Sequence, residues 1–131
     1  MGRVLVVDDN DDERLIYSAV LRHHGHEVEQ AGDGVDAMEL ARSFRPDVIL
    51  MDVHMPVMDG LLAAKALRNQ SDTANIPIIC VTGYDIHPSQ AAAAGCNRFI
   101  RKPIPPTMLV NEIAALIELP PGTTEPVIGT S

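Results

Sequence analysis

The chain has 131 residues, a length that predicts one compact domain. Hydrophobic residues make up 46% and charged residues 21%, which excludes a disordered, collagen-like or coiled-coil protein over most of the chain. The net charge of −8 argues against direct binding to nucleic acid, whose phosphates carry the same sign. The sequence shows neither the ~18 apolar residues of a membrane span nor a signal-peptide pattern, so we expect a soluble cytoplasmic protein without membrane contact.

The first part of the chain predicts two strand–helix pairs. Residues 4–7 are a continuous apolar run that stops at Asp8, as in a strand buried on both faces. Asn10 and Glu13 have the spacing of a capping box and predict the start of a helix that Gly25 ends. Residues 26–30 alternate like a more exposed strand. Apolar stripes at helical spacing lie at Leu15, Ile16, Ala19 and Val20, and then at Ala37, Leu40, Ala41 and Phe44.

The rest of the chain repeats this pattern three times. Apolar runs at 48–51 and 78–81 stop at Asp52 and Thr82, and residues 98–101 predict a weaker fifth strand. Helices are predicted from the stripe at Gly60, Ala63, Ala64 and Leu67, from Ser89 to Ala94, and from the stripe at Leu109, Ile113, Leu116 and Ile117. Five strand–helix pairs predict an α/β fold with a parallel five-stranded sheet covered by helices on both faces.

The cysteines and the end of the chain lead to two further expectations. Cys80 and Cys96 are too few for a disulfide scaffold and lack CxxC spacing, so we expect buried free thiols in a reducing compartment. From Pro120 the composition is that of a linker. We therefore expect a domain at residues 1–119 and a flexible tail or the start of a linker at 120–131, without a further helix or strand.

Polar residues follow the predicted strands at the edge where a parallel α/β sheet binds ligands. Three carboxylates, a hydroxyl and an ammonium come together there from separate segments: Asp8, Asp9, Asp52, Thr82 and Lys102. Three ionised carboxylates cannot share one place without a cation. Mg²⁺ is the expected partner because it prefers carboxylate oxygens and water.

These residues resemble the motifs of the response-regulator receiver domain of two-component phosphorelay systems, a flavodoxin-like (βα)5 three-layer sandwich. The resemblance covers about residues 3–119. It rests on the acidic pair Asp8-Asp9, Asp52 with Met55-Pro56 and Gly60, Thr82 with Gly83, Phe99, and Lys102 before Pro103.

The resemblance implies a role for each motif residue. Asp52 takes a phosphoryl group from a phospho-histidine, and Mg²⁺ or Mn²⁺ binds Asp8, Asp9, Asp52 and the backbone carbonyl of His54. Lys102, in a cis peptide bond with Pro103, pairs with the acceptor and then with a phosphate oxygen. Thr82, beside Gly83, donates to another phosphate oxygen, and Phe99 is the aromatic switch residue.

The resemblance also implies partners. A sensor histidine kinase or a histidine phosphotransfer protein supplies the phosphoryl group, and an output protein or fused effector domain binds the fifth strand and the last two helices. The domain is a monomer or weak homodimer. It is not an enzyme beyond catalysing its own phosphorylation and dephosphorylation.

His54 and Tyr84 flank the expected phosphate, and we predict that they set its lifetime. Both side chains are rings without a carboxylate or amide to align a water molecule, so we expect them to obstruct hydrolysis and give a long-lived phosphoryl group. The alternative is that neutral His54 acts as a base for that water.

Two other protein classes use similar parts. A cobalamin-binding module has an Asp-x-His-x-x-Gly motif, which Asp52 and His54 imitate, but Val57 stands at the glycine position and the motif belongs in the first strand–helix loop. A haloacid-dehalogenase-like phosphatase needs Asp-x-Asp, and His54 stands at the second position.

Overall fold

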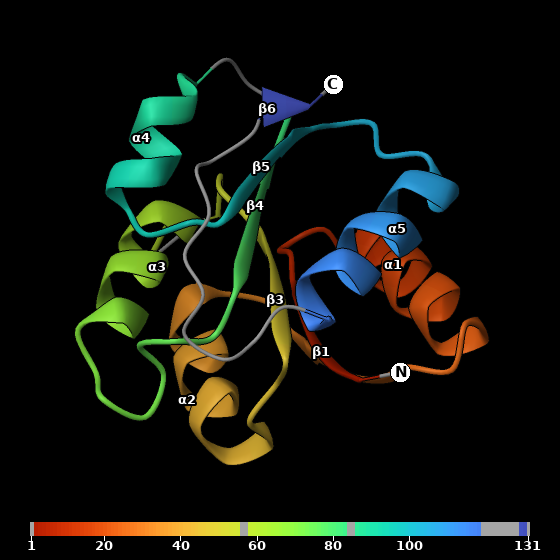
Figure 1. Ribbon diagram of the computed structural model, residues 1–131, viewed down its shortest axis with the longest axis horizontal. Coiled ribbons are helices and arrows are strands. Elements are labelled where there is room, and N and C mark those ends of the chain that lie inside the picture. Colours follow the sequence, from red (N-terminus) through yellow and green to blue (C-terminus); the bar gives the residue numbers. More distant parts are fainter. Residues whose placement is uncertain (1, 56–57, 84–85, 119–128, 131) are drawn as a thin grey trace.

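The computed structural model describes residues 2–55, 58–83, 86–118 and 129–130. Strands and helices alternate along the chain (Figure 1). The strands are β1 Arg3–Val7, β2 Glu27–Ala31, β3 Val48–Asp52, β4 Ile78–Thr82, β5 Arg98–Arg101 and β6 Gly129–Thr130. The helices are α1 Asp11–His23, α2 Gly34–Phe44, α3 Gly60–Arg68, α4 Pro88–Ala93 and α5 Pro106–Ile117. The predicted five strand–helix pairs and the α/β class are confirmed.

The sheet is parallel throughout, with the order β2-β1-β3-β4-β5-β6. The chain moves from β1 outward to β2 and then crosses to β3 on the other side of β1, so the strand order reverses between β1 and β3. The carboxyl ends of these two central strands therefore lie side by side at the place where such sheets bind ligands.

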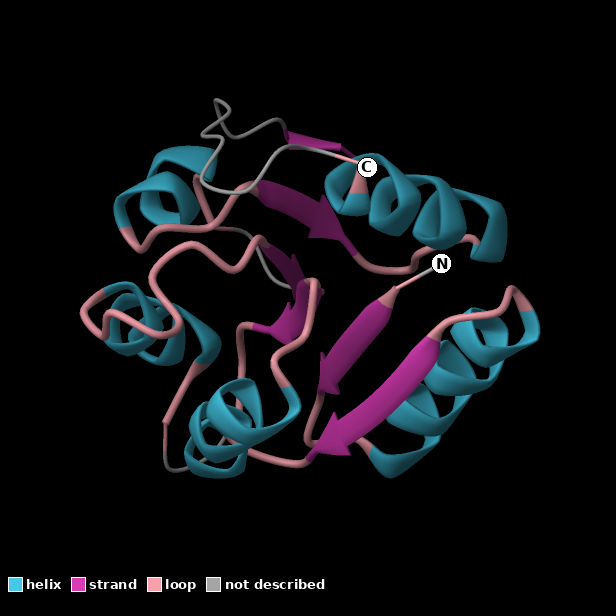
Figure 2. Ribbon diagram, turned by 60° about the horizontal axis from the view of Figure 1, so that its bottom comes forward, coloured by secondary structure: helices cyan, strands magenta, loops and turns pink. Residues whose placement is uncertain are grey.

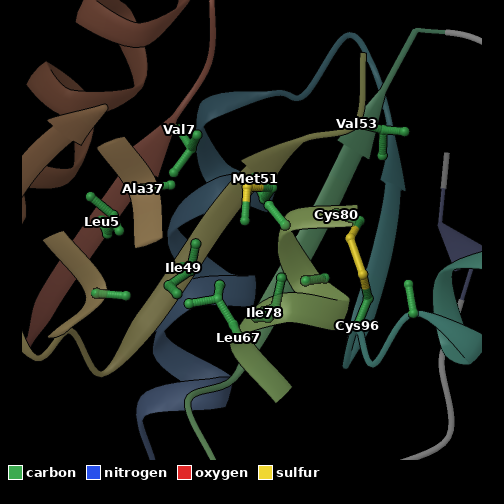
Figure 3. Packing of buried hydrophobic residues seen from close by; sticks show 14 of the residues in the cluster. Leu5, Val7, Ala37, Ile49, Met51, Val53, Leu67, Ile78, Cys80 and Cys96 are labelled. Atoms are coloured by element: carbon green, nitrogen blue, oxygen red, sulfur yellow. A yellow bond between two sulfur atoms is a disulfide. The ribbon is translucent and has the colours of Figure 1, made fainter. Parts of the chain in front are cut away.

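Helices cover both faces of the sheet (Figure 2). Successive strand residues point to opposite faces and divide the core in two. One core packs residues such as Leu5, Ile49 and Ile78 against α2, α3 and α4 (Figure 3). The other packs residues such as Val4 and Leu50 against α1 and α5. The inner strands β1, β3 and β4 contain continuous apolar runs because each of them contributes to both cores.

Side-chain caps fix where four of the helices begin. The N-cap residues of α1, α2, α3 and α4 each accept a hydrogen bond from a backbone N–H in the first turn: Asn10, Asp33, Asp59 and His87. After α1 the chain turns back through Gly25, whose φ of 90° favours glycine. The predicted glycine stop is confirmed.

Helix α1 buries a different face from the predicted one. The structure leaves Leu15 and Ile16 more than half exposed and turns Tyr17, Ser18 and Leu21 inward. The sequence pattern was misleading because a serine lies on the buried face. The Ser18 hydroxyl donates to the backbone carbonyl of Arg14 at 2.7 Å, which removes the penalty of burying it.

The expectation of free thiols is wrong. Cys80 in β4 and Cys96 before β5 form a disulfide across a sequence separation of 16 (Figure 3). Both cysteines are buried, as expected, but their apolar surroundings in sequence did not reveal that the fold brings them together.

The end of the chain also differs from the prediction. Gly129 and Thr130 form strand β6, which pairs in parallel with Phe99 and Ile100 of β5 (Figure 1). The tail was predicted to hold no further element, because two residues of a segment rich in proline, threonine and glycine carry no strand pattern. Of the other tail residues, 119–128 and 131 lie outside the described part of the chain.

Among the described residues, no helix has the length and apolar character needed to cross a lipid bilayer.

Candidate functional site

Three carboxylates meet at the carboxyl ends of β1 and β3. Asp8 and Asp9 follow β1, and Asp52 is the last residue of β3. Each offers an oxygen within 4.8 Å of the others. Asp8 and Asp52 are buried, whereas Asp9 is exposed. The predicted grouping of these residues is therefore present, with two of the three carboxylates removed from water.

Hydrogen bonds hold the end of β1 in place. One oxygen of Asp8 accepts the backbone N–H of Asn10 at 2.9 Å. The guanidinium of Arg14 donates to the backbone carbonyl of Asp8 at 2.8 Å, and it also contacts Asp11 and Gln30. These contacts tie the first turn of α1 to the strand end, so Asp8 is held from both its side chain and its backbone.

A glycine lets α3 approach the end of β3. The N–H of Gly60 donates to the carbonyl of Val53 at 2.7 Å. A Cβ atom at this position would lie 2.2 Å from the carbonyl oxygen of Asp52. The loop from Asp52 to α3 can therefore close only around a residue without a side chain.

Lys102 places its ammonium among carboxylates. Its Nζ lies 2.5 Å from Glu13, 3.3 Å from Asp8 and 3.6 Å from Asp52. The Lys102–Pro103 peptide bond is cis. The backbone N–H of Lys102 donates to the carbonyl of Thr82 at 2.8 Å, so the segment that carries the lysine is joined to the end of β4.

The electrostatics of the site depend on this ammonium. Burial raises the pKa of Asp52 to about 7; Lys102 opposes the rise, and the charges of Asp8 and Asp9 add to it. Burial also raises the pKa of Asp8, although the Asn10 N–H and Lys102 oppose it. For Lys102 burial lowers the pKa, but the Glu13 hydrogen bond and the neighbouring carboxylates outweigh it and raise the value. The lysine stays charged, but one ammonium cannot balance the negative charge of the three clustered carboxylates and Glu13.

The remaining motif residues lie around this centre. Thr82 is fully buried at the end of β4, and a side chain on the neighbouring Gly83 would meet nothing within 4 Å. His54 is exposed. Phe99 is buried in the core on β5, opposite Cys80 in the strand register. Tyr84, like Pro56 of the Met55-Pro56 motif, lies outside the described residues.

Sequence reasoning missed the part that Glu13 plays. The residue was interpreted as the acidic partner in a capping box, and Asn10 does accept the Glu13 N–H at 3.0 Å. The Glu13 carboxylate, however, lies on Lys102, a residue 89 positions away in the chain. No local pattern carries a signal for that contact.

Comparison with known proteins identifies the family. The family model described as the response regulator receiver domain matches residues 4–114. The chain belongs to this family. PilH of Pseudomonas aeruginosa is 36% identical over 119 residues, covering 89% of this chain and 98% of PilH. The polar-differentiation response regulator DivK of Brucella anthropi is 33% identical over 103 residues, covering 77% of this chain and 84% of DivK.

Solved receiver structures agree with the fold. The chemotaxis protein CheY4 of Vibrio cholerae matches with a TM-score of 0.84 and 36% identity, over 88% of this chain and 98% of that one. The receiver domain of a sensor histidine kinase of Pseudomonas aeruginosa PAO1, solved with a magnesium ion in its active site cleft, matches with a TM-score of 0.82 and 31% identity, over 88% and 97%. Membership of the family decides against the cobalamin-binding and phosphatase alternatives.

Proposed function

We propose that Asp52 accepts a phosphoryl group from the phospho-histidine of a sensor kinase or phosphotransfer protein. The observation that carries this proposal is the position of Asp52 at the end of a central strand, with Asp8 and Asp9 on one side and the ammonium of Lys102 at 3.6 Å. Receiver domains are signalling modules, so the reaction is a single transfer onto the protein itself and not turnover of a substrate.

The three carboxylates fit a divalent cation. Their oxygens are hard donors within 4.8 Å of one another, and burial together with mutual repulsion raises the pKa of Asp52 to about 7. Asp8, Asp9, Asp52 and the backbone carbonyl of His54 would hold Mg²⁺ or Mn²⁺. When bound, this ion supplies positive charge to the carboxylates and to the oxygens of the phosphoryl group.

The side chains of this chain would then do the following. A carboxylate oxygen of Asp52 forms the new bond to phosphorus while the phosphorus–nitrogen bond of the donor breaks, and the imidazole nitrogen of the donor keeps the electron pair. Lys102 is close enough to Asp52 for its ammonium to pair with a phosphoryl oxygen after the transfer. Thr82 and Gly83 lie at the end of β4, the adjacent strand, where a hydroxyl can donate to another oxygen.

Signal output would pass from Thr82 through Phe99 on β5 to the surface formed by α4, β5 and α5. The backbone of Lys102 already links β5 to the Thr82 carbonyl, so a shift at either end reaches the other. An output protein or effector domain that binds this surface would respond to the relative populations of the unphosphorylated and phosphorylated conformations. We assign residues 1–119 to this receiver domain and residues 120–131 to a tail or the start of a linker. Strand β6, at Gly129–Thr130, belongs to that last segment and pairs with β5.

The experiment is incubation with acetyl phosphate and Mg²⁺, followed by intact-mass measurement. We expect the mass of one phosphoryl group on the wild-type protein and none on the Asp52→Asn variant or after chelation of the metal. Equal labelling of the variant would overturn the assignment.

A matched pair of variants tests the cation ligands. Asp9→Ala removes a carboxylate of the cluster, whereas Asp12→Ala removes one from the exposed first turn of α1. We expect Asp9→Ala to slow labelling at least tenfold and Asp12→Ala to leave the rate within about twofold. Equal losses would show that the acidic run acts only as a diffuse negative charge.

A further inference from the structure

The closest anionic partner of Lys102 comes from a helix and not from a strand end. Glu13 contacts the ammonium at 2.5 Å, against 3.3 Å for Asp8 and 3.6 Å for Asp52. Glu13 lies in the first turn of α1. The lysine is therefore shared between the acidic cluster and α1, and its shortest contact is on the α1 side.

The carboxylate of Glu13 is available for this contact because the helix start does not use it. In a full capping box the acidic side chain would accept the backbone N–H of the N-cap residue. Here that N–H, on Asn10, donates to Asp8 instead. Asn10 still caps the Glu13 N–H, so α1 is capped on one side and the Glu13 carboxylate reaches Lys102.

This contact affects the balance between two cations that compete for the same oxygens. An ammonium resting on Asp8 and Asp52 would neutralise them and hinder a divalent ion from binding. Glu13 draws the ammonium toward α1 and adds a negative charge at the edge of the site. Both effects leave the Asp52 carboxylate more open to a divalent cation.

We propose that Glu13 is a positioning residue that holds Lys102 on the α1 side of the site and so sets its affinity for the divalent cation. The inference rests on the proposed function, in which Asp8, Asp9 and Asp52 hold that ion. Glu13 itself does not contact the ion. It acts through Lys102, which must leave it to follow a phosphoryl group onto Asp52.

The test is the dissociation constant of Mn²⁺, measured on the unphosphorylated full chain by electron paramagnetic resonance. We expect Glu13→Gln to weaken binding about five- to tenfold, because the ammonium then rests on Asp8 and Asp52 alone. Asp12→Asn is the matched control: it removes one charge from the same turn of α1, and Asp12 is exposed. We expect it to weaken binding less than twofold.

A double-mutant cycle separates positioning from simple loss of charge. In a Lys102→Met background, the effect of Glu13→Gln should shrink to the part that its negative charge alone contributes, because no ammonium remains to be held. Circular dichroism of each variant checks that the fold is kept, as the intact Asn10 cap leads us to expect.

The outcomes distinguish this inference from the proposed function. Equal weakening by Glu13→Gln with and without Lys102, or equal weakening by Glu13→Gln and Asp12→Asn, would overturn the positioning role and leave phosphorylation of Asp52 untouched. Wild-type protein that binds no Mn²⁺ would overturn this role together with the cation site. Mn²⁺ binding does not require a phosphoryl group, so failure of Asp52 to be labelled would not change this readout.

Discussion

At the scale of single residues, Gly60 fixes the backbone of the proposed phosphoryl acceptor by having no side chain. An added Cβ would lie 2.2 Å from the carbonyl oxygen of Asp52 and 2.9 Å from the Cα of Val53, and both are backbone atoms that cannot rotate away. We expect Gly60→Ala to lower the free energy of unfolding by about 2–3 kcal/mol, as overpacking does in a rigid core. Urea denaturation of the variant and the wild type measures the difference in the free energy of unfolding.

Gly83 is the matched control for that substitution. It lies at the same edge of the sheet, and an added Cβ would meet nothing within 4 Å. Gly83→Ala should change the free energy of unfolding by less than about 0.5 kcal/mol. A similar loss from both variants would show that backbone freedom, and not the contact with Asp52, makes glycine necessary at position 60.

The raised pKa of Asp52 predicts how stability depends on pH without a divalent cation. The pKa of this carboxyl is 3.8 in the unfolded chain and about 7 in the folded one, so the folded protein holds the proton more tightly. Its contribution to stability is therefore full below about pH 4 and is lost as the pH rises through about 7. The Asp52→Asn variant should not lose stability in this way, because an asparagine side chain carries no titrating proton.

Thermal unfolding at pH 5 and pH 8 with a metal chelator checks the sign. We expect Asp52→Asn to gain stability over the wild type at pH 8 by on the order of 2–4 kcal/mol relative to pH 5. Added Mg²⁺ should raise the melting temperature of the wild type and act much less on the variant. A stability difference that does not change with pH would contradict the burial of an ionisable Asp52.

Residue-scale prediction from the sequence succeeded where topology alone decides the outcome. Asp8, Asp52 and Thr82 each stand at the end of a strand, so a parallel sheet brings them together whatever the details of packing. The partner of Glu13 could not be predicted in this way, because a local capping pattern explained the residue equally well. The pairing of Cys80 with Cys96 likewise depends on how the turn before β5 packs against β4.

At the scale of elements, Arg68 joins the end of α3 to two loops. Its guanidinium donates to the backbone carbonyls of Gly95, Ala74 and Ile76 and to the side chain of Asn97, at 2.6–3.1 Å. Burial lowers the pKa of Arg68. A planar group with five N–H donors is needed to serve four oxygens at once.

We expect Arg68→Lys to lower the free energy of unfolding by about 1–2 kcal/mol, since an ammonium cannot reach all four acceptors and leaves part-buried carbonyls unpaired. Arg42→Lys is the control, because Arg42 also lies in the last turn of a helix, α2, but is exposed. Its effect should stay within about 0.5 kcal/mol. Chemical denaturation of the two variants makes the comparison, and equal effects would contradict the role of the Arg68 hydrogen bonds.

Element boundaries followed from the sequence more closely than the buried faces did. The stripe of α3 at Gly60, Ala63, Ala64 and Leu67 is buried as predicted. On α1, by contrast, counting apolar residues selected the solvent-facing side. The orientation of a helix is set by the surfaces that it packs against, and here Tyr17 and Leu21 pack into the core that α1 shares with the sheet and α5.

At the scale of the whole molecule, the parallel sheet and its two helical layers could be predicted because strands β1, β3 and β4 contain continuous apolar runs, as strands buried on both faces require. The sixth strand could not, since Gly129 and Thr130 carry no periodic pattern. They pair with β5, which would otherwise be the last strand of the sheet. An edge strand offers unpaired N–H and carbonyl groups to any extended segment within reach. A strand of this kind cannot be predicted from sequence when its pairing depends on the distance between the segment and the edge strand and not on its amino-acid composition.

The disulfide between Cys80 and Cys96 has a consequence for the continuity of the chain. It closes a covalent ring that contains Thr82, Tyr84 and helix α4. Chymotrypsin cleavage after Tyr84 would therefore open the ring without releasing a fragment: without reductant the mass should rise by one water, and with reductant residues 1–84 and 85–131 should separate. The Cys96→Ser variant should separate without reductant, and separation of the wild type under the same conditions would contradict the bond. A molecule nicked in this way would still carry Asp52 and Lys102 on one covalent framework, although the peptide chain between them is broken.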